Sequence, residues 1–363
     1  MSSLKKINEL GQSIWLDFFD RELLDSGSLQ KLIDEGVSGI TSNPSIFEKA
    51  ISSSSDYDQD VSQLGKGGQS NDDIFFAFAV KDIQRAADIL KPVYDKNKGT
   101  DGFVSLEVSP HLARDTQGTI DQAMHLWKEI GRENVMIKIP GTAEGLPAIR
   151  KCISEGININ VTLLFGLDRY EEVTNAYLSG LEDRLKNNKA IDKVASVASF
   201  FLSRIDVLID PLLEAKGLGN LKGKIAIDSA KVAYQIYKEV FESDRFLELK
   251  KQGANTQKVL WASTSTKDPA FSDVMYVEAL IAPDTINTLP KETIDAFIDH
   301  GKAHNYLEEN LVEATDQLEE LKAREINLDM ITSQLEEEGI EKFNKAYGQL
   351  ISAIDQKKNK VTA

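Results

Sequence analysis

Cysteine is nearly absent from this chain of 363 residues, since Cys152 is the one cysteine. A single cysteine allows no internal disulfide and no cysteine-based zinc site. Long apolar runs are absent too, and no stretch approaches the roughly 20 residues that a membrane helix needs. The first residues, Met-Ser-Ser-Leu-Lys-Lys, lead into polar sequence rather than a signal-peptide core. These absences predict a cytoplasmic protein with no membrane partner.

Positive charge is also scarce. The chain has 42 Lys+Arg against 58 Asp+Glu, which gives a net charge of −16. A nucleic-acid binder relies on a basic surface that neutralises phosphates, so this balance argues against nucleic acid as a partner. The excess is uneven, because residues 301–341 hold 12 acidic and 3 basic residues. The global charge therefore says little about a small anionic substrate elsewhere.

Short apolar runs alternate with longer helical patterns along the chain. At 41% hydrophobic residues, the sequence has enough apolar side chains to bury a core. Candidate strands lie at 13–19, 37–43, 102–109, 135–140, 157–163, 194–199, 258–263 and 285–289. Among the helices between them, 73–94, 120–130 and 167–185 repeat apolar residues at three- and four-residue steps. Eight strands in this alternation predict an α/β fold, a closed (β/α)8 TIM barrel.

Two regions fit the repeat poorly. Residues 52–55 and 65–70 bracket a polar stretch that we expect to be a loop excursion. The chain after Gly301 shows no strand pattern, and its apolar spacing predicts a tail, residues 301–363, of three helices packed on the barrel. No linker rich in Pro, Gly or Ser divides the chain, so we expect one domain over 1–363.

Polar residues gather on one face of strand after strand, near the carboxyl end. Alternate strand residues point to opposite faces, so each strand can be divided by parity. The polar residues that collect on one parity of their strands are Asp17, Thr41, Asn43, Ser105, Glu107, Ser109, Lys138, Asn158, Asn160, Thr162 and Ser199. Solvated strand ends would explain one or two of them. Barrel active sites are built at the carboxyl ends of strands, so the full set predicts an active site.

Lys138 is the most informative of these residues, because it lies inside the apolar segment VMIKIP. Burial removes solvation from an ammonium ion and favours the neutral amine, which can attack a carbonyl to form a Schiff base. A structural lysine paired with Glu107 or Asp17 is the alternative. Two carboxylates and several amides at the same rim favour the nucleophile.

Several segments together resemble transaldolase, over essentially the whole length from Trp15 to Leu289. The similar segments are WLDFFDR (15–21), GITSNPSIF (39–47), SLEVSP (105–110), VMIKIPGT (135–142), GININVTLLF (156–165) and WASTSTKDP (261–269). The long front end and helical tail are similar to the bacterial long-chain branch of that family.

The resemblance implies a class I aldolase-like (β/α)8 barrel that uses a Schiff base and neither metal nor organic cofactor. The family moves a dihydroxyacetone unit between sugar phosphates in the pentose phosphate pathway. The usual substrates, sedoheptulose 7-phosphate and glyceraldehyde 3-phosphate, give erythrose 4-phosphate and fructose 6-phosphate.

The resemblance also implies roles for individual residues. Lys138 matches the Schiff-base lysine, and Glu107 matches the carboxylate that moves protons through a water. Asp17 matches the acid/base at the C3–C4 bond. Asn43, Asn160 and Thr162 match residues that orient the dihydroxyacetone unit and the water. Ser199 and Arg204 match a pair near the substrate and its phosphate.

The phosphate clamp is the loosest match. The family's best-known branch has a Ser-x-Arg clamp after the seventh strand, where Ser265 and Lys267 keep the spacing here with lysine in place of arginine. Lysine holds phosphate as a point charge rather than as a planar fork. A shifted alignment makes Ser263 the contact instead.

Two other functions stay open at this point. The same residues suit a fructose 6-phosphate aldolase-type enzyme that releases free dihydroxyacetone. A non-catalytic sugar-phosphate-binding barrel would need a disabled site, which the sequence does not show. The oligomeric state stays open between monomer and homodimer.

Overall fold

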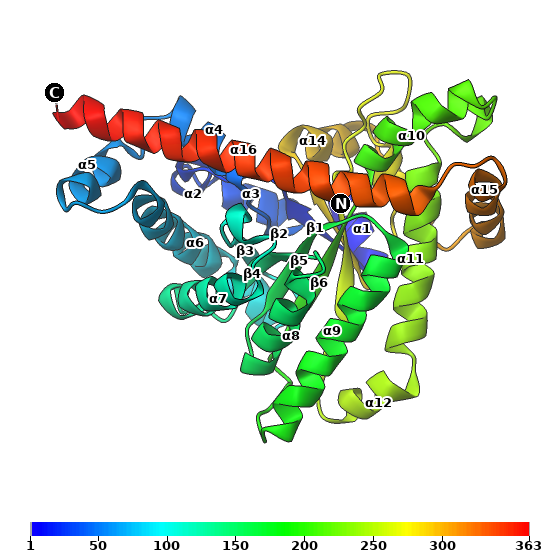
Figure 1. Cartoon of the computed structure of the whole chain (residues 1–363), viewed down its shortest axis with the longest axis horizontal. Helices are drawn as coiled ribbons and strands as arrows, with labels where there is room; N and C mark the ends of the chain where they lie inside the picture. The colour runs from blue at the N-terminus through cyan, green and yellow to red at the C-terminus, as the bar shows by residue number, and fades with distance from the viewer. Residues whose placement is uncertain (1, 363) are drawn as a thin grey trace.

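The chain folds as a barrel of eight parallel strands surrounded by helices (Figure 1). The computed structural model describes residues 2–362, with side chains up to residue 359. The strands are β1 (Gln12–Leu16), β2 (Val37–Ile40), β3 (Val104–Glu107), β4 (Val135–Pro140), β5 (Ile159–Leu164), β6 (Ser196–Phe201), β7 (Gln257–Ala262) and β8 (Thr285–Leu289). They lie in chain order, and β8 pairs in parallel with β1 to close the barrel. The predicted (β/α)8 barrel is confirmed.

The helices follow the strands as the (β/α) repeat requires. Those before β5 are α1 (Ser3–Glu9), α2 (Arg21–Asp25), α3 (Ser28–Glu35), α4 (Pro44–Ser53), α5 (Asp58–Lys66), α6 (Asn71–Lys96), the 3-10 turn η1 (Pro110–Leu112), α7 (Thr116–Ile130) and α8 (Gly145–Glu155). Those after it are α9 (Leu167–Lys186), α10 (Ser203–Ala215), η2 (Gly219–Leu221), α11 (Ile225–Phe241), α12 (Asp244–Lys251), α13 (Met275–Ala279), α14 (Lys291–His300), α15 (Leu311–Ala323) and α16 (Leu328–Thr362). Within residues 2–362, none of these helices is long and apolar enough to cross a membrane.

One parity of each strand faces the barrel interior, as the alternation predicts. A cavity of about 180 Å³ at the amino ends of the strands is lined by Trp15, Met136, Val197 and Ile286, among others. The residues two positions further along each of those strands line a second cavity of about 180 Å³ at the carboxyl ends: Asp17, Lys138, Ser199 and Thr288. At these four interior positions, the side chains therefore change from apolar to polar along each strand.

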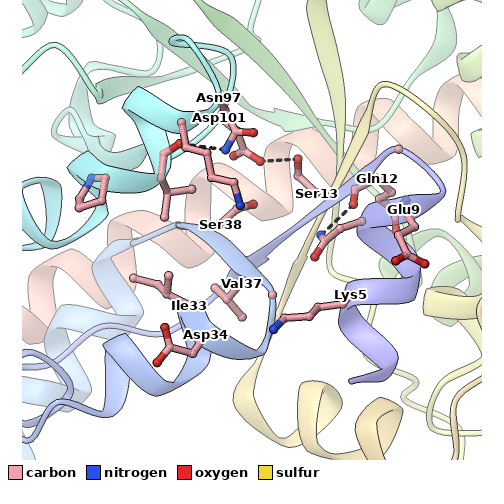
Figure 2. Close-up of a pocket in the computed structure, with 16 residues that line it drawn as sticks. Lys5, Glu9, Gln12, Ser13, Ile33, Asp34, Val37, Ser38, Asn97 and Asp101 are labelled. Carbon is pink, nitrogen blue, oxygen red and sulfur yellow. Dashed lines mark hydrogen bonds between the residues drawn. The ribbon is translucent and has the colours of Figure 1, made fainter. Parts of the chain in front are cut away.

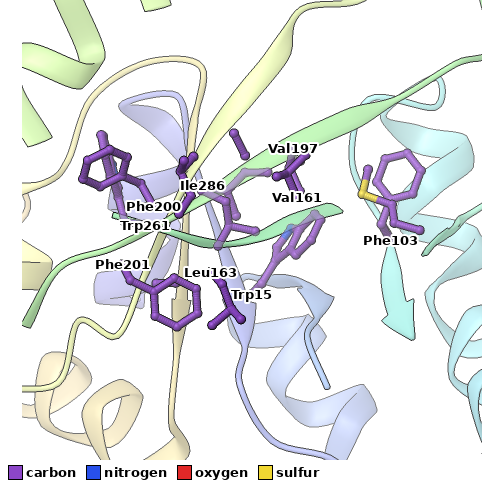
Figure 3. Close-up of a cluster of buried hydrophobic side chains, with 14 of the residues drawn as sticks. Trp15, Phe103, Val161, Leu163, Val197, Phe200, Phe201, Trp261 and Ile286 are labelled. Atoms are coloured by element: carbon purple, nitrogen blue, oxygen red, sulfur yellow. The ribbon is translucent and has the colours of Figure 1, made fainter. Parts of the chain in front are cut away.

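Large buried side chains lie on both faces of the barrel sheet (Figure 3). Trp15 lies inside the barrel, whereas Trp261 faces the helices and meets Phe200 edge to face with ring centroids 6.3 Å apart. The indole of Trp15 lies against Gly39, where a Cβ atom would come within 2.6 Å of the ring. β2 therefore needs glycine at this position for Trp15 to fit inside.

The stretch between residues 52–55 and 65–70 is not the loop that its polar composition predicts. It contains α5, whose exposed face is polar and whose Val61 is fully buried. Helix α5 packs against α6 and α16, so its few apolar contacts are enough to hold it. The loop prediction was wrong because a helix between two others needs only a narrow apolar stripe.

The chain after Gly301 forms two helices in the described residues, α15 and α16, rather than the predicted three. Helix α16 spans 35 residues and crosses the molecule as the long red helix of Figure 1. It contacts α4, α5, α6, α10, η1 and β5. It therefore lies over the carboxyl end of the barrel.

Candidate active site

Lys138 lies inside the barrel with its amine in polar surroundings. It is 5% exposed, and its Nζ donates a hydrogen bond to the backbone carbonyl of Ser42 at 2.9 Å. The nearest carboxylate oxygen, Oε2 of Glu107 on the neighbouring strand β3, is 3.5 Å away. That separation is an ion-pair distance rather than a short hydrogen bond. The pair follows from the register, which puts Glu107 directly opposite Lys138.

Glu107 is itself 5% exposed. Burial raises the pKa of Glu107 to about 7, and the attraction of Lys138 opposes part of that rise. A carboxyl group with a pKa near 7 can both take up and release a proton at neutral pH, which suits a proton-transfer role.

Asp17 approaches Lys138 from the other side of the barrel interior. Its Oδ1 accepts a hydrogen bond from Thr41 Oγ1 at 2.9 Å, and Thr41 Oγ1 is 2.7 Å from Thr288 Oγ1. Burial raises the pKa of Asp17, while Lys138 and the Thr41 hydrogen bond lower it. The two carboxylates thus lie in different surroundings, which favours different protonation states.

A buried network fixes Asn160 beside Lys138. Ser199 Oγ donates to Asn160 Oδ1 at 2.7 Å, and Asn160 Nδ2 donates to Ser105 Oγ at 3.1 Å. Ser42 Oγ donates to the backbone carbonyl of Ser105 at 2.7 Å. The network orients the amide and the carbonyl that receives the lysine hydrogen bond.

The sequence-predicted residues divide between the cavity wall and the layer behind it. The cavity at the carboxyl ends is lined by Asp17, Thr41, Asn43, Lys138, Thr162, Ser199, Phe201, Arg204, Ala262, Ser263, Thr264, Ser265, Lys267, Thr288, Pro290 and Phe343. Glu107 and Asn160 are buried behind that surface. Asn43 also begins α4, because its Oδ1 accepts from the backbone N–H of Ile46 at 3.0 Å. Its amide nitrogen is the group that it can offer to a ligand.

One side of the cavity is suited to an anion. The guanidinium of Arg204 lies 5.2 Å from the ring centroid of Phe201, and its buried Nη1 has no hydrogen-bond partner among the described residues. Burial lowers the pKa of Arg204, against the attraction of Asp17 and Glu338. Nearby, Lys267 Nζ donates to Ser265 Oγ at 2.7 Å. Ser263 Oγ is 2.9 Å from Ser203 Oγ.

The structure adds Phe343, which sequence reasoning missed. It comes from α16, nearly 140 residues after Arg204, and closes the cavity opposite the strand ends. On the same helix, Gly339 lies over Leu163 and Arg204, where a Cβ atom would come within 2.9 Å of Leu163 and 3.8 Å of Arg204. Helical spacing of Ile340, Phe343 and Tyr347 was the available signal, but it says nothing about which surface the helix covers.

A larger cavity, of about 840 Å³, opens at the opposite end of the barrel (Figure 2). Lys5, Glu9, Asp34 and Asp101 are among its lining residues. Asp101 is already engaged, because Ser13 Oγ and Trp15 Nε1 donate to it. Size alone favours this larger cavity as the active site. The smaller cavity is favoured instead by the lysine and carboxylates that converge on it and by the guanidinium of Arg204. Across residues 2–362, no group of three or more His, Cys, Asp or Glu side chains is placed to hold a metal ion.

Comparison with known proteins identifies the family of the chain. The family described as "Transaldolase/Fructose-6-phosphate aldolase" matches residues 14–354. A transaldolase of Trichodesmium erythraeum is 49% identical, covering 99% of this chain and 98% of its own length. "Transaldolase 2" of a Nostoc species is 48% identical, with 98% of both chains covered. The transaldolase of Saccharopolyspora erythraea is 45% identical, with 97% of both covered. The chain belongs to the transaldolase/fructose-6-phosphate aldolase family.

Proposed function

We propose that this chain is a transaldolase that works through a Schiff base on Lys138. It transfers a dihydroxyacetone unit from sedoheptulose 7-phosphate to glyceraldehyde 3-phosphate and gives erythrose 4-phosphate and fructose 6-phosphate. The observation that carries the proposal is a buried amine with two carboxylates near it, beside a cavity lined by Arg204, whose Nη1 has no hydrogen-bond partner among the described residues. The full-length likeness to transaldolases supports the same activity.

In the proposed mechanism, Lys138 Nζ adds to the donor's C2 carbonyl to form a carbinolamine. Loss of water then gives the Schiff base, with Glu107 moving the protons through a water molecule. Asp17 takes the proton of the C4 hydroxyl as the C3–C4 bond breaks. The aldose phosphate leaves, and the three-carbon unit stays on Lys138 as an enamine.

The second half of the reaction reverses these steps on a new aldehyde. The enamine carbon attacks the acceptor carbonyl, and Asp17 returns its proton to the forming alkoxide. Water hydrolyses the new Schiff base, so that Lys138 is recovered as a free amine. Asn43, Asn160 and Thr162 orient the three-carbon unit and the water, and Ser199 lies beside it.

We further propose that the chain acts as one domain, in the cytoplasm, as a monomer or homodimer. The groups assigned above run from Asp17 to Phe343, so they come both from the barrel and from the helices after it. One core cluster runs from Leu4 to Ile354 and joins the barrel to the helices after it.

An acceptor-dependence assay tests the function. With fructose 6-phosphate as donor, we expect glyceraldehyde 3-phosphate to accumulate about tenfold faster or more when erythrose 4-phosphate is present, because the acceptor empties the enamine. The family description also includes fructose 6-phosphate aldolases. Cleavage that is equally fast without acceptor, with release of free dihydroxyacetone, would assign the chain to that activity instead.

The anion side of the cavity has its own test. We expect Arg204→Ala to raise KM for fructose 6-phosphate by about 10- to 100-fold, since a charge-assisted contact to phosphate is lost. KM for free dihydroxyacetone as donor should stay within about twofold, because it has no phosphate. Arg245→Ala, which removes a surface ion pair with Glu182, is the control. Equal changes for both donors would mean that the phosphate binds elsewhere.

A further inference from the structure

The segment 263–274 connects β7 to α13 without regular secondary structure. It carries Ser263, Ser265 and Lys267 on the wall of the candidate active site. Loops of about this length inside a compact domain are uncommon and are usually functional. Its two ends are anchored, since Thr264 Oγ1 donates to Asn287 Oδ1 at 2.8 Å and Val274 is buried, but the residues between them are partly or fully exposed. Something else must fix its position if Lys267 is to meet a phosphate.

One face of α10 supplies that fixation. Ser203, Asp206 and Asp210 are spaced three and four residues apart, so they lie on the same side of the helix. Arg204 belongs to the first turn of the same helix. Helix α10 therefore presents the guanidinium to the cavity and a row of polar groups to the segment 263–274.

Two of these three residues bind the chain at the two ends of the segment, and the third acts on its middle through Gly223. At its start, Ser203 N donates to the Ser263 carbonyl at 2.9 Å, and the two Oγ atoms are 2.9 Å apart. Just past its end, Tyr276 Oη donates to Asp206 Oδ2 at 2.6 Å.

The middle point is held indirectly. Asp210 Oδ1 accepts from Gly223 N at 3.1 Å, and the ring of Phe271 rests against Gly223, where a Cβ atom would be 2.8 Å from it.

Of these three contacts, we expect the Asp206–Tyr276 hydrogen bond to matter most for the position of the segment. Both residues are 3% exposed, and Asp206 Oδ1 also accepts from the backbone N–H of Ala226 at 2.9 Å. Burial raises the pKa of Asp206 to about 7, which shows how unfavourable the position is for a carboxylate. A buried polar pair of this kind gives positional specificity more readily than net stability.

A cavity of about 180 Å³ separates the segment from α10, so apolar packing does not take over the work of the hydrogen bonds. Its lining includes Asp206, Asp210, Lys267, Phe271 and Tyr276. Loss of the tyrosine hydroxyl would therefore remove one of the few contacts between α10 and this side of the segment.

We propose that Asp206 and Tyr276 are positioning residues that hold the segment 263–274 on α10, so that Ser265 and Lys267 reach the same phosphate as Arg204. The inference rests on the proposed function for the identity of the phosphorylated substrate. A loop that is already held in its binding conformation loses less conformational entropy when the anion binds, and this raises the affinity for the anion.

Tyr276→Phe removes only the hydroxyl. We expect KM for fructose 6-phosphate to rise by about 3- to 10-fold, with kcat and the KM for free dihydroxyacetone within about twofold of the wild type. Tyr234→Phe is the matched control, since Tyr234 is equally buried and its Oη donates to the Pro283 carbonyl, away from the cavity. Asp206→Asn is the second variant if Tyr276→Phe folds poorly, because its single amide oxygen cannot accept from both Tyr276 and Ala226. An equal rise in KM for fructose 6-phosphate and for free dihydroxyacetone would overturn the proposal.

A double-mutant cycle separates positioning from general stability. Because Tyr276 acts through Lys267, Tyr276→Phe should change KM for fructose 6-phosphate by less than about twofold when Lys267 is already alanine. Additive effects of the two changes would overturn the proposal.

Inorganic phosphate gives a reading that does not depend on turnover. We expect it to raise the melting temperature of the wild type more than that of Tyr276→Phe. An equal rise in both would overturn the inference whether or not the chain transfers dihydroxyacetone. A wild type without transfer activity would overturn the proposed function alone.

Discussion

Replacing Lys138 with arginine should lower transfer activity by about 10⁴-fold or more and abolish covalent labelling. Arginine keeps the positive charge but has no amine that can be made neutral and add to a carbonyl. In the wild type, borohydride with fructose 6-phosphate should reduce the Schiff base and attach the three-carbon unit to Lys138. Peptide mass analysis after reduction is the measurement.

Lys258→Arg is the matched control for that experiment. Lys258 also lies on a barrel strand, but it lines the cavity at the amino ends of the strands. It should label as little as any surface lysine, and its replacement should leave transfer within about twofold of the wild type. Labelling that survives in Lys138→Arg would assign the nucleophile to another residue.

The second large effect concerns Glu107. Glu107→Gln should lower kcat by about 10²- to 10⁴-fold, the range of a lost proton-transfer group. With the pKa of Glu107 raised to about 7, wild-type kcat/KM should rise as the pH increases through that value and the carboxylate forms. The glutamine variant cannot ionise, so this limb of the pH profile should disappear.

The same pKa shift affects stability with a defined sign. Burial raises the pKa of Glu107 from 4.5 to about 7. A carboxyl whose pKa is higher in the folded state contributes stability below about pH 4.5 and loses that contribution as the pH rises through about 7. Chemical unfolding at pH 5 and pH 8 should show a smaller pH difference for Glu107→Gln than for the wild type. Glu278→Gln is the control, at a partly exposed carboxylate that accepts from the backbone N–H of Lys302. If the pH profile of kcat/KM stays unchanged in Glu107→Gln, the rise near pH 7 belongs to another group.

The barrel and its polar end could be predicted because strand parity is a local property. Once VMIKIP and SLEV are strands, Lys138 and Glu107 must share a face with the polar residues of their neighbours. Strand ends were less well predicted at β1 and β2, which stop at Leu16 and Ile40 rather than at 19 and 43. There the chain leaves the barrel to place Asp17 and Asn43, and α4 begins directly afterwards.

Strand parity could not predict how deep a side chain lies in the barrel or which distant residues it contacts. The alternation places Glu107 inside the barrel, but its position behind the cavity wall depends on the tilt of every strand. Phe343 belongs to a helix after the last strand and Tyr276 to the short helix between β7 and β8, and no local pattern connects either of them to Lys138 or Arg204. The polar stretch containing α5 was assigned to a loop for a related reason, since its partners in α16 lie almost 300 residues away.

Helix α16 also affects the order in which a working molecule can be made. Lys357 Nζ donates to the Ser54 carbonyl at 2.8 Å, and Tyr347 Oη donates to Asp72 at 2.6 Å, so the helix is fastened to some of the earliest segments of the chain. Contacts between such distant segments form late, because a long stretch of chain must first be ordered. All eight strands, with Lys138 in place, can leave the ribosome before Phe343 exists to close the cavity. A chain that ends before residue 343 would therefore lack the side chain that α16 contributes to the cavity beside Lys138.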